Sequence, residues 1–210
     1  MLMKVLITGH NGYVGRVLTK LLVENNYEVV GCDTNYFPAT FQDKRYPEIL
    51  NVAPDIRDIT IENLKETDVV LHLAGLSNDP LGELNSQLTH EINYLSTIKL
   101  AELSKKAGVK KFIFSSSCAT YGKTGATVNE ESDLDPLTQY AKSKINSEFK
   151  ILELTDDVFY TTILRNATAY GYSPNLRLDV VVNNLTASAF VTGKVKLLSD
   201  GTAWRPLLHV

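Results

Sequence analysis

A tyrosine and a lysine, Tyr140 and Lys144, stand four residues apart in a segment with helical periodicity. Residues at this spacing share one face of a helix. A tyrosine hydroxyl ionises near pH 10 in water, which is too high for a general base at neutral pH, but an adjacent ammonium stabilises the phenolate. The pair is a candidate acid-base centre, although Tyr-x-x-x-Lys alone also occurs on ordinary amphipathic helices.

Three hydroxyl side chains, Ser115, Ser116 and Ser117, follow an apolar run of strand length. Open α/β sheets bind ligands at the carboxyl ends of their strands, which is where these serines are expected. The alternative is a serine-rich turn without a chemical role. Their place between a glycine-rich loop and Tyr140 favours the functional interpretation.

The glycine-rich loop, Thr8–Gly15, lies between a strand pattern and a helix pattern. Gly9 permits a tight turn, Gly12 lets backbone N–H groups approach a pyrophosphate, and Gly15 lets the helix pack closely. The helix N-terminus adds a partial positive charge that favours phosphate. The other loop residues expected to contact a dinucleotide are Asn11, Tyr13 and Val14.

Asp33 ends the second strand pattern, 18 positions after Gly15. A carboxylate there can accept hydrogen bonds from the ribose hydroxyls of an adenosine, and it would repel a 2′-phosphate. No arginine follows at Thr34, Asn35 or Tyr36. The sequence therefore predicts NAD rather than NADP as the cofactor.

The elements that must position these residues alternate between strands and helices. The apolar runs predict a sheet buried on both faces by helices, and the alternation predicts a doubly wound parallel sheet of the α/β class. The expected strands are Lys4–Ile7, Glu28–Cys32, Ile49–Val52, Asp68–Leu73, Lys111–Ser115 and Tyr160–Leu164. The expected helices are Tyr13–Glu24, His90–Lys106 and Leu137–Leu154. Their inward faces are predicted to carry Val14, Val17, Leu18, Leu21 and Leu22 in the first, and Ile92, Leu95, Ile98, Ala101 and Leu103 in the second.

Five motifs occur in an order that resembles the extended short-chain dehydrogenases/reductases, and more narrowly the NAD-dependent sugar epimerase/dehydratase family. They are Thr-Gly-x-x-Gly-x-x-Gly at 8–15, Asp-Ile-Arg-Asp at 55–58, His-Leu-Ala-Gly at 72–75, Ser-Ser-Ser-Cys-Ala-Thr-Tyr-Gly at 115–122 and Tyr-Ala-Lys-Ser-Lys at 140–144. The resemblance covers essentially the whole chain. It implies a Rossmann-type fold, NAD as cofactor and a nucleotide-linked sugar as substrate.

The resemblance also implies roles for individual residues. Tyr140 is the implied base, Lys144 its partner, and Ser117 the group that hydrogen-bonds the reacting hydroxyl. Asp55 and Ile56 would flank the adenine, and Asn93 would support the site. The remaining implied cofactor contacts are Leu73, Ala74, Gly75 and Ser115. The implied substrate contacts are Ser77, Ser117, Tyr140, Thr168, Asn183 and Arg205.

Two departures from the family pattern bear on the reaction. Sugar 4,6-dehydratases carry Asp and Glu after the catalytic hydroxyl, whereas this chain has Cys118 and Ala119. Neither can do that acid-base work at neutral pH, which argues against 4,6-dehydration. Thr168 replaces the usual substrate-binding Asn. Residues 1–166 are expected to form the NAD-binding domain and 167–210 a partial substrate lobe, shorter than is usual in the family.

The function expected is epimerisation by transient oxidation of a sugar hydroxyl. A net NAD-dependent sugar dehydrogenase or reductase would use the same residues. A catalytically inactive NAD-binding module is the alternative from another class, because the substrate lobe is incomplete. A homodimer through the helices at 90–106 and 137–154 is expected.

Composition narrows the other possibilities. Lysine and arginine number 21 against 24 aspartates and glutamates, which does not suggest a nucleic-acid partner. No apolar run approaches the length of a membrane span. Cys32 and Cys118 lie far apart without metal-ligand spacing, so no metal is expected. The N-terminal strand pattern without a signal-peptide layout favours a cytoplasmic protein.

Overall fold

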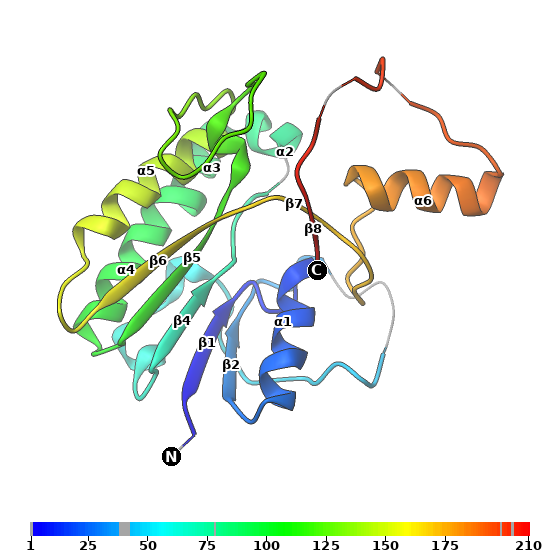
Figure 1. Cartoon of the computed structure of the whole chain (residues 1–210). Coiled ribbons are helices and arrows are strands. Elements are labelled where there is room, and N and C mark those ends of the chain that lie inside the picture. The colour runs from blue at the N-terminus through cyan, green and yellow to red at the C-terminus, as the bar shows by residue number, and fades with distance from the viewer. Residues whose placement is uncertain (1, 38–42, 78, 198, 203) are drawn as a thin grey trace.

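The computed structural model describes residues 2–37, 43–77, 79–197, 199–202 and 204–210. Six parallel strands form one sheet in the order β3-β2-β1-β4-β5-β6 (Figure 1). This order reverses beside β1, which creates a topological switch point between the carboxyl ends of β1 and β4. The strands are β1 (Lys4–Thr8), β2 (Glu28–Cys32), β3 (Asn51–Ala53), β4 (Val69–His72), β5 (Lys111–Ser117) and β6 (Tyr160–Asn166). The predicted doubly wound Rossmann-type sheet is confirmed.

Helices and short turns connect these strands. The helices are α1 (Tyr13–Glu24), α2 (Asp79–Leu84), α3 (Ser86–His90), α4 (Ser96–Lys106), α5 (Gln139–Glu153) and α6 (Val181–Thr192). A π-helical turn, η3 (Glu91–Leu95), joins α3 to α4. The 3₁₀ turns are η1 (Ile56–Asp58), η2 (Ile61–Leu64) and η4 (Cys118–Tyr121). None of the described helices has the length and apolar composition needed to span a bilayer.

The alternation of side chains along each strand divides the core in two. Leu6 of β1 packs in the larger cluster with Leu100 of α4 and Ile151 of α5. Val5 and Ile7 point to the opposite face, where Leu18 and Leu22 of α1 cover them. A helix about 10–12 Å wide can cover roughly two strands that lie about 4.8 Å apart. Among the described residues the second face is therefore only partly covered, and Leu164 of β6 is 44% exposed.

The inward face predicted for α1 is partly wrong. Val14 and Leu21 are exposed, while Gly15 and Thr19 are buried. A Cβ on Gly15 would lie 2.0 Å from the carbonyl oxygen of Gly9. This close approach places position 15 against the loop, so positions 14 and 21 turn toward solvent.

The helix expected at His90–Lys106 is interrupted by the π-helical turn. A π turn accommodates one more residue than an α turn and so rotates the residues that follow it. Leu95, predicted to point inward, is 51% exposed, whereas Leu100 is fully buried. The predicted inward face of this helix was wrong at Leu95 for that reason.

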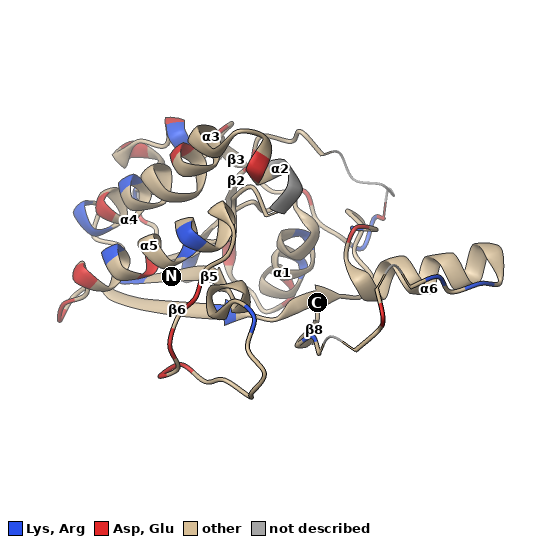
Figure 2. Cartoon of the chain, turned by 90° about the horizontal axis from the view of Figure 1, so that it is seen from above, with Lys and Arg blue, Asp and Glu red and all other residues tan. Residues whose placement is uncertain are grey.

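The last part of the chain lies beside the sheet rather than within it. β7 (Thr168–Tyr170) and β8 (Leu207–His209) form a separate parallel pair. Viewed from above, α6 extends away from the sheet and carries almost no charge (Figure 2). Phe190 on this helix is 91% exposed.

Replacing Leu100 with alanine should lower the free energy of unfolding by about 2–5 kcal/mol, because it leaves a cavity in the buried core. Leu95→Ala is the matched control on the same helical segment and should change it by less than about 0.5 kcal/mol. Urea denaturation followed by circular dichroism measures both. Equal effects of the two changes would contradict the helical register given to η3 and α4.

Candidate functional site

The glycine loop lies at the switch point, at the carboxyl end of β1. Gly9 has a φ of 75° and donates its N–H to Cys32 O at 2.8 Å, which ties the loop to β2. A side chain is hard to accommodate here, because positive φ is unfavourable for residues with a Cβ. Gly12 is the N-cap of α1 and donates to Gly9 O at 3.0 Å, and no side chain caps this helix end. The first-turn N–H groups of α1 are therefore suited to an anionic ligand.

Asp33 lies directly beside this loop. Its carboxylate accepts the backbone N–H of Asn11 at 3.0 Å and that of Asn35 at 2.8 Å. The side chain of Asn51 brackets the backbone of Asp33, accepting from its N–H and donating to its carbonyl, both at 3.0 Å. These bonds fix the carboxylate at the carboxyl end of β2, where an adenosine ribose is expected.

The segment after β4 is fixed by one buried asparagine. Asn93 lies in η3 and is 1% exposed; its side chain accepts from Leu76 N at 2.7 Å and donates to Leu76 O at 3.0 Å. Its backbone carbonyl accepts the hydroxyls of Thr97 and Ser147. Asn93 therefore joins the segment containing Leu73, Ala74 and Gly75 to α4 and α5. The supporting role implied by the sequence fits this geometry.

His72 joins the same segment to the glycine loop. Its ring lies between the hydroxyls of Thr8, at 2.6 Å, and Thr97, at 2.8 Å. Because Thr97 gives its own proton to Asn93 O, the ring donates from Nε2 and accepts from Thr8 at Nδ1. Complete burial, assisted by the charge of Lys144, lowers the pKa of His72 to about 3. The sequence reasoning quoted this histidine in a motif without assigning it this role.

Lys144 lies at the centre of the site. It is 4% exposed and its Nζ donates to Ser115 O, at the end of β5, at 2.8 Å. Nζ lies 4.5 Å from the ring centroid of Phe114 and 5.6 Å from that of Tyr140. Burial lowers the pKa of Lys144 to about 8, and the charge of Glu148 opposes this shift. The predicted pair, Tyr140 and Lys144, therefore lies on α5 next to β5, the strand that ends in the predicted serines.

The three serines have different environments. The Ser115 hydroxyl accepts from Asn166 Nδ2 at 3.0 Å, and Ser116 donates to buried Glu148. Ser117 caps η4, where its hydroxyl accepts the N–H of Ala119 at 3.1 Å. As an acceptor in that bond, the Ser117 hydroxyl keeps its own proton for another partner.

Several other predicted contacts are engaged within the protein. Asp55 pairs with Arg57 at 2.8 Å, and this neighbouring guanidinium lowers the pKa of Asp55. Ile56 is buried in the core, while Val14 is 39% exposed. Tyr13 is 6% exposed and donates its hydroxyl to Gly171 O at 2.8 Å.

Asn183 holds α6 to the glycine loop rather than standing free. Its side chain donates to Tyr13 Oη at 3.1 Å and to Arg177 O at 2.9 Å, and it accepts from Gly171 N at 3.0 Å. A bond donated by this amide to a substrate would have to replace one of these, because both N–H groups are already used. Thr168 is half-buried in β7.

Arg177 is a site residue that the sequence reasoning missed. Its guanidinium donates to Ser77 Oγ at 3.0 Å and pairs with Asp179, and the Asp179 carboxylate raises the pKa of Arg177. The guanidinium also interacts electrostatically with the side chains of Tyr140 and Tyr13, so it lies on the Tyr140 side of the site. The pairing with Ser77 joins residues 100 positions apart, and the only local signal was the Arg-x-Asp spacing.

Arg205 is exposed, and its charge acts on the Cys118 thiol. Burial raises the pKa of Cys118, and Arg205 opposes this. Arg205 therefore lies on the side of the serine turn. Three of the predicted substrate contacts, Thr168, Asn183 and Arg205, lie in the segment that follows β6. The fourth, Ser77, pairs with Arg177 of that segment.

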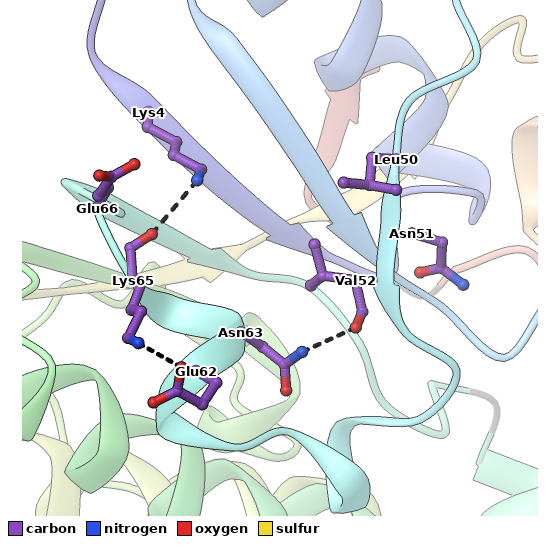
Figure 3. Close-up of a pocket in the computed structure, with 8 residues that line it drawn as sticks. All are labelled: Lys4, Leu50, Asn51, Val52, Glu62, Asn63, Lys65 and Glu66. Carbon is purple, nitrogen blue, oxygen red and sulfur yellow. Dashed lines mark hydrogen bonds and ion pairs between the residues drawn. The ribbon is translucent and has the colours of Figure 1, made fainter.

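A surface hollow lies at the other end of the sheet. Its lining includes Lys4, at the start of β1, and Lys65 and Glu66, which precede β4 (Figure 3). Lys4 donates to Lys65 O at 3.3 Å there. Because parallel strands share one direction, this hollow is at the amino edge and separate from the candidate site.

Comparison with known proteins agrees with this geometry. The model of the NAD dependent epimerase/dehydratase family matches residues 5–210. The chain is 28% identical to a putative UDP-glucose 4-epimerase of Methanocaldococcus jannaschii, over 98% of this chain and 69% of that protein. It is also 28% identical to the UDP-glucose 4-epimerase of Bacillus subtilis, over 99% and 69%.

Solved structures are similar over the same extent. MoeE5 in complex with UDP-glucuronic acid and NAD superposes with a TM-score of 0.84 at 27% identity, covering 98% of this chain and 68% of that one. The UDP-glucuronic acid 4-epimerase of Bacillus cereus, with UDP-glucuronic acid and NAD, gives 0.83 at 26%, covering 99% and 69%. An NDP-hexosamine 5,6-dehydratase of tunicamycin biosynthesis gives 0.87 at 25%, covering 99% and 68%.

Asp33 should make the protein bind NAD more tightly than NADP, because a 2′-phosphate would meet its fixed carboxylate. We expect a difference on the order of tenfold or more, and Asp33→Ala should reduce it. Calorimetric titration of both dinucleotides measures this, with Glu62→Ala at the opposite edge of the sheet as the control. Tighter binding of NADP by the unchanged protein would refute the role given to Asp33.

Proposed function

Because this chain belongs to the NAD dependent epimerase/dehydratase family, we propose that it is a nucleotide-sugar epimerase that works by transient oxidation of a sugar hydroxyl. Membership makes it an NAD-dependent enzyme. The observation that carries the proposal is the burial of Lys144 beside Tyr140, with its ammonium bonded to the carboxyl end of β5. That arrangement suits proton exchange with a hydroxyl held next to Ser117.

The described residues fit NAD. The uncapped N-terminus of α1 would hold the pyrophosphate, and Gly9, Gly12 and Gly15 let the loop backbone pack tightly around that helix end. Asp33 would accept the adenosine ribose hydroxyls. The segment from Leu73 to Gly75 would line the cofactor between the glycine loop and α5. When bound, NAD would supply the hydride acceptor for the oxidation and the hydride donor for the reduction of the sugar carbon.

Tyr140 is the group that exchanges the hydroxyl proton in this proposal. As phenolate it accepts the proton when the carbon is oxidised, and it returns the proton when the carbonyl is reduced on the other face. The ammonium of Lys144 stabilises the phenolate. Ser117 can donate to the reacting oxygen, because its hydroxyl accepts the N–H of Ala119 and keeps its own proton.

Water elimination is disfavoured by the residues after Ser117. Cys118 and Ala119 occupy η4, and burial raises the pKa of the Cys118 thiol. A protonated, partly buried thiol is a poor general base, and alanine offers no proton to a leaving hydroxyl. The chain itself therefore favours epimerisation over dehydration, although a dehydratase is among its structural neighbours.

The division of labour follows the chain. Residues 1–166 carry every group assigned to NAD, and 167–210 contribute to the sugar side. Support for this comes from Asn183 and Arg177, which attach the second segment to Tyr13 and Ser77. Both contacts lie at the margin of the site, and neither involves Lys144.

The reaction can be tested by incubating the protein with NAD and either UDP-glucose or UDP-glucuronic acid and identifying the products by NMR. An epimerase yields the stereoisomer without accumulating NADH. Accumulated NADH would instead identify a net dehydrogenase. NAD binding without either product would identify an inactive module and refute the proposal.

Tyr140→Phe should reduce turnover by roughly two to four orders of magnitude, the range for a lost general acid-base group. The affinity for NAD should change little, because the phenol is not among its main contacts. Tyr160→Phe, which alters an exposed tyrosine, is the control for both measurements. Near-normal turnover of Tyr140→Phe would remove this residue from the mechanism.

The proposal includes a homodimer through the helical layer of α4 and α5. Phe149 and Leu152 of α5 are 58% and 50% exposed in this layer. Burial of such side chains in a paired copy would be favourable. Phe149→Glu should convert the dimer to a monomer in light scattering, whereas Phe190→Glu on α6 should not. A monomer for the unchanged protein would refute this part.

A further inference from the structure

Glu148 and Arg165 form a buried ion pair that the proposed reaction does not use directly. Glu148 is 2% exposed and lies one helical turn after Lys144 on α5. Arg165 of β6 donates to its carboxylate from Nε at 3.0 Å and from Nη2 at 2.7 Å. Both bonds end on Glu148 Oε2, and Nε also lies 3.3 Å from Oε1, so the charged pair is closely hydrogen-bonded.

The pair reaches the serine turn on both sides. Ser116, next to Ser117, donates its hydroxyl to Glu148. Arg165 donates from Nη1 to Tyr121 Oη at 2.9 Å, and its guanidinium lies 5.1 Å from the centroid of that ring. Tyr121 ends η4, the turn that Ser117 caps. The pair therefore ties α5, β5, β6 and η4 together beneath the candidate site.

The surroundings of Lys144 show why a negative charge is needed there. Its neighbours from β5 are the Phe114 ring and Ser115 O, and from β4 the neutral ring of His72. From η3, the Asn93 side chain lies near Gly75: a Cβ added to this glycine would stand 3.0 Å from Asn93 Oδ1 and 3.9 Å from Nζ. Tyr140 lies on the same helix. Of the acids in the described part of the chain, Glu148 is the one whose charge acts on Lys144.

We infer that Glu148 is a positioning residue: it keeps Lys144 in the ammonium form beside Tyr140, and Arg165 limits how strongly it does so. A buried ammonium without an anion nearby tends to lose its proton. A lysine amine would no longer stabilise the Tyr140 phenolate. A fully unpaired Glu148 would hold the ammonium more strongly. This inference rests on the proposed function, because it assigns Glu148 to the same proton exchange.

The two members of the pair predict shifts of opposite sign. Lys144 has a pKa lowered to about 8 by burial, and Glu148 raises it. Glu148→Gln removes the negative charge and leaves the guanidinium, so the pKa should fall further. Arg165→Met leaves the carboxylate unpaired, so the pKa should rise. A change of one pH unit is a tenfold change in the ratio of ammonium to amine, and we expect about that much for each variant.

The test is a pH titration of the 210-residue chain labelled with ¹³C at lysine Cε, with the Lys144 resonance assigned by Lys144→Arg. We expect a lower midpoint in Glu148→Gln, a higher one in Arg165→Met, and a midpoint near that of the unchanged protein in the double variant. A purely structural pair would disturb both single variants alike, so shifts in the same direction, or none in Glu148→Gln, would overturn the inference. If Glu148→Gln does not fold, the sign in Arg165→Met decides.

This readout needs no turnover, so it distinguishes the inference from the proposed function. If the protein epimerises a nucleotide sugar, the alkaline limb of turnover should move in the same directions as the NMR midpoints. Opposite NMR shifts without any turnover would support the role of Glu148 and count against the proposed reaction. Unshifted midpoints in an active enzyme would support the proposed reaction and count against the role of Glu148.

Discussion

The burial of one ammonium group is the constraint on which the carboxyl edge of the sheet depends. Removing the charge of Lys144 from water is costly unless the protein replaces its hydration with acceptors and negative charge. Ser115 O supplies the acceptor, the Phe114 ring supplies a favourable face, and Glu148 supplies the charge. His72 is neutral mainly because its own ring is completely buried, and the charge of Lys144 reinforces this. The proton exchange proposed for Tyr140 and the packing of β5 against α5 therefore both depend on where Lys144 is placed.

A second constraint comes from the π-helical turn. Its carbonyls are taken up by hydroxyls: Ser96 donates to Glu91 O, and Thr97 and Ser147 donate to Asn93 O. With its backbone held in this way, Asn93 can use its whole side chain on Leu76. The segment expected to line the cofactor and the helix that carries Tyr140 are thereby joined through one residue. A π-helical turn breaks the regular hydrogen-bond pattern of an α-helix and changes the direction of its side chains. Such turns are often found at functional sites.

The sequence was sufficient for the sheet, the glycine loop and the register of Tyr140 with Lys144, because each is local and has a strong period or spacing. It was insufficient for the π turn, since one inserted residue leaves the helical pattern nearly unchanged on both sides while moving Leu95 outward. It was also insufficient for pairs between distant residues. Arg177 meets Ser77, and Arg165 meets Glu148, only after the strands have been ordered. No residue close in sequence to Arg165 indicates its partner. Close to Arg177, only Asp179 does.

The segment after β6 shows how attachment and recognition compete for the same groups. Asn183 uses its amide to hold Tyr13, Gly171 and Arg177, and Arg177 in turn holds Ser77 and Asp179. These bonds bring the segment to the switch point, but they also occupy the polar groups that a sugar would otherwise meet. Thr168 and Arg205 differ, because Thr168 lies half-buried in β7 and Arg205 is exposed on the side of Cys118. In the cofactor half, the side chains of Asp33 and Asn93 are held by bonds within the fold, while the first-turn N–H groups of α1 have no side-chain cap. In the proposed reaction, selectivity for the sugar would come from groups such as Thr168 and Arg205, and from any exchange of bonds that a substrate induces at Arg177.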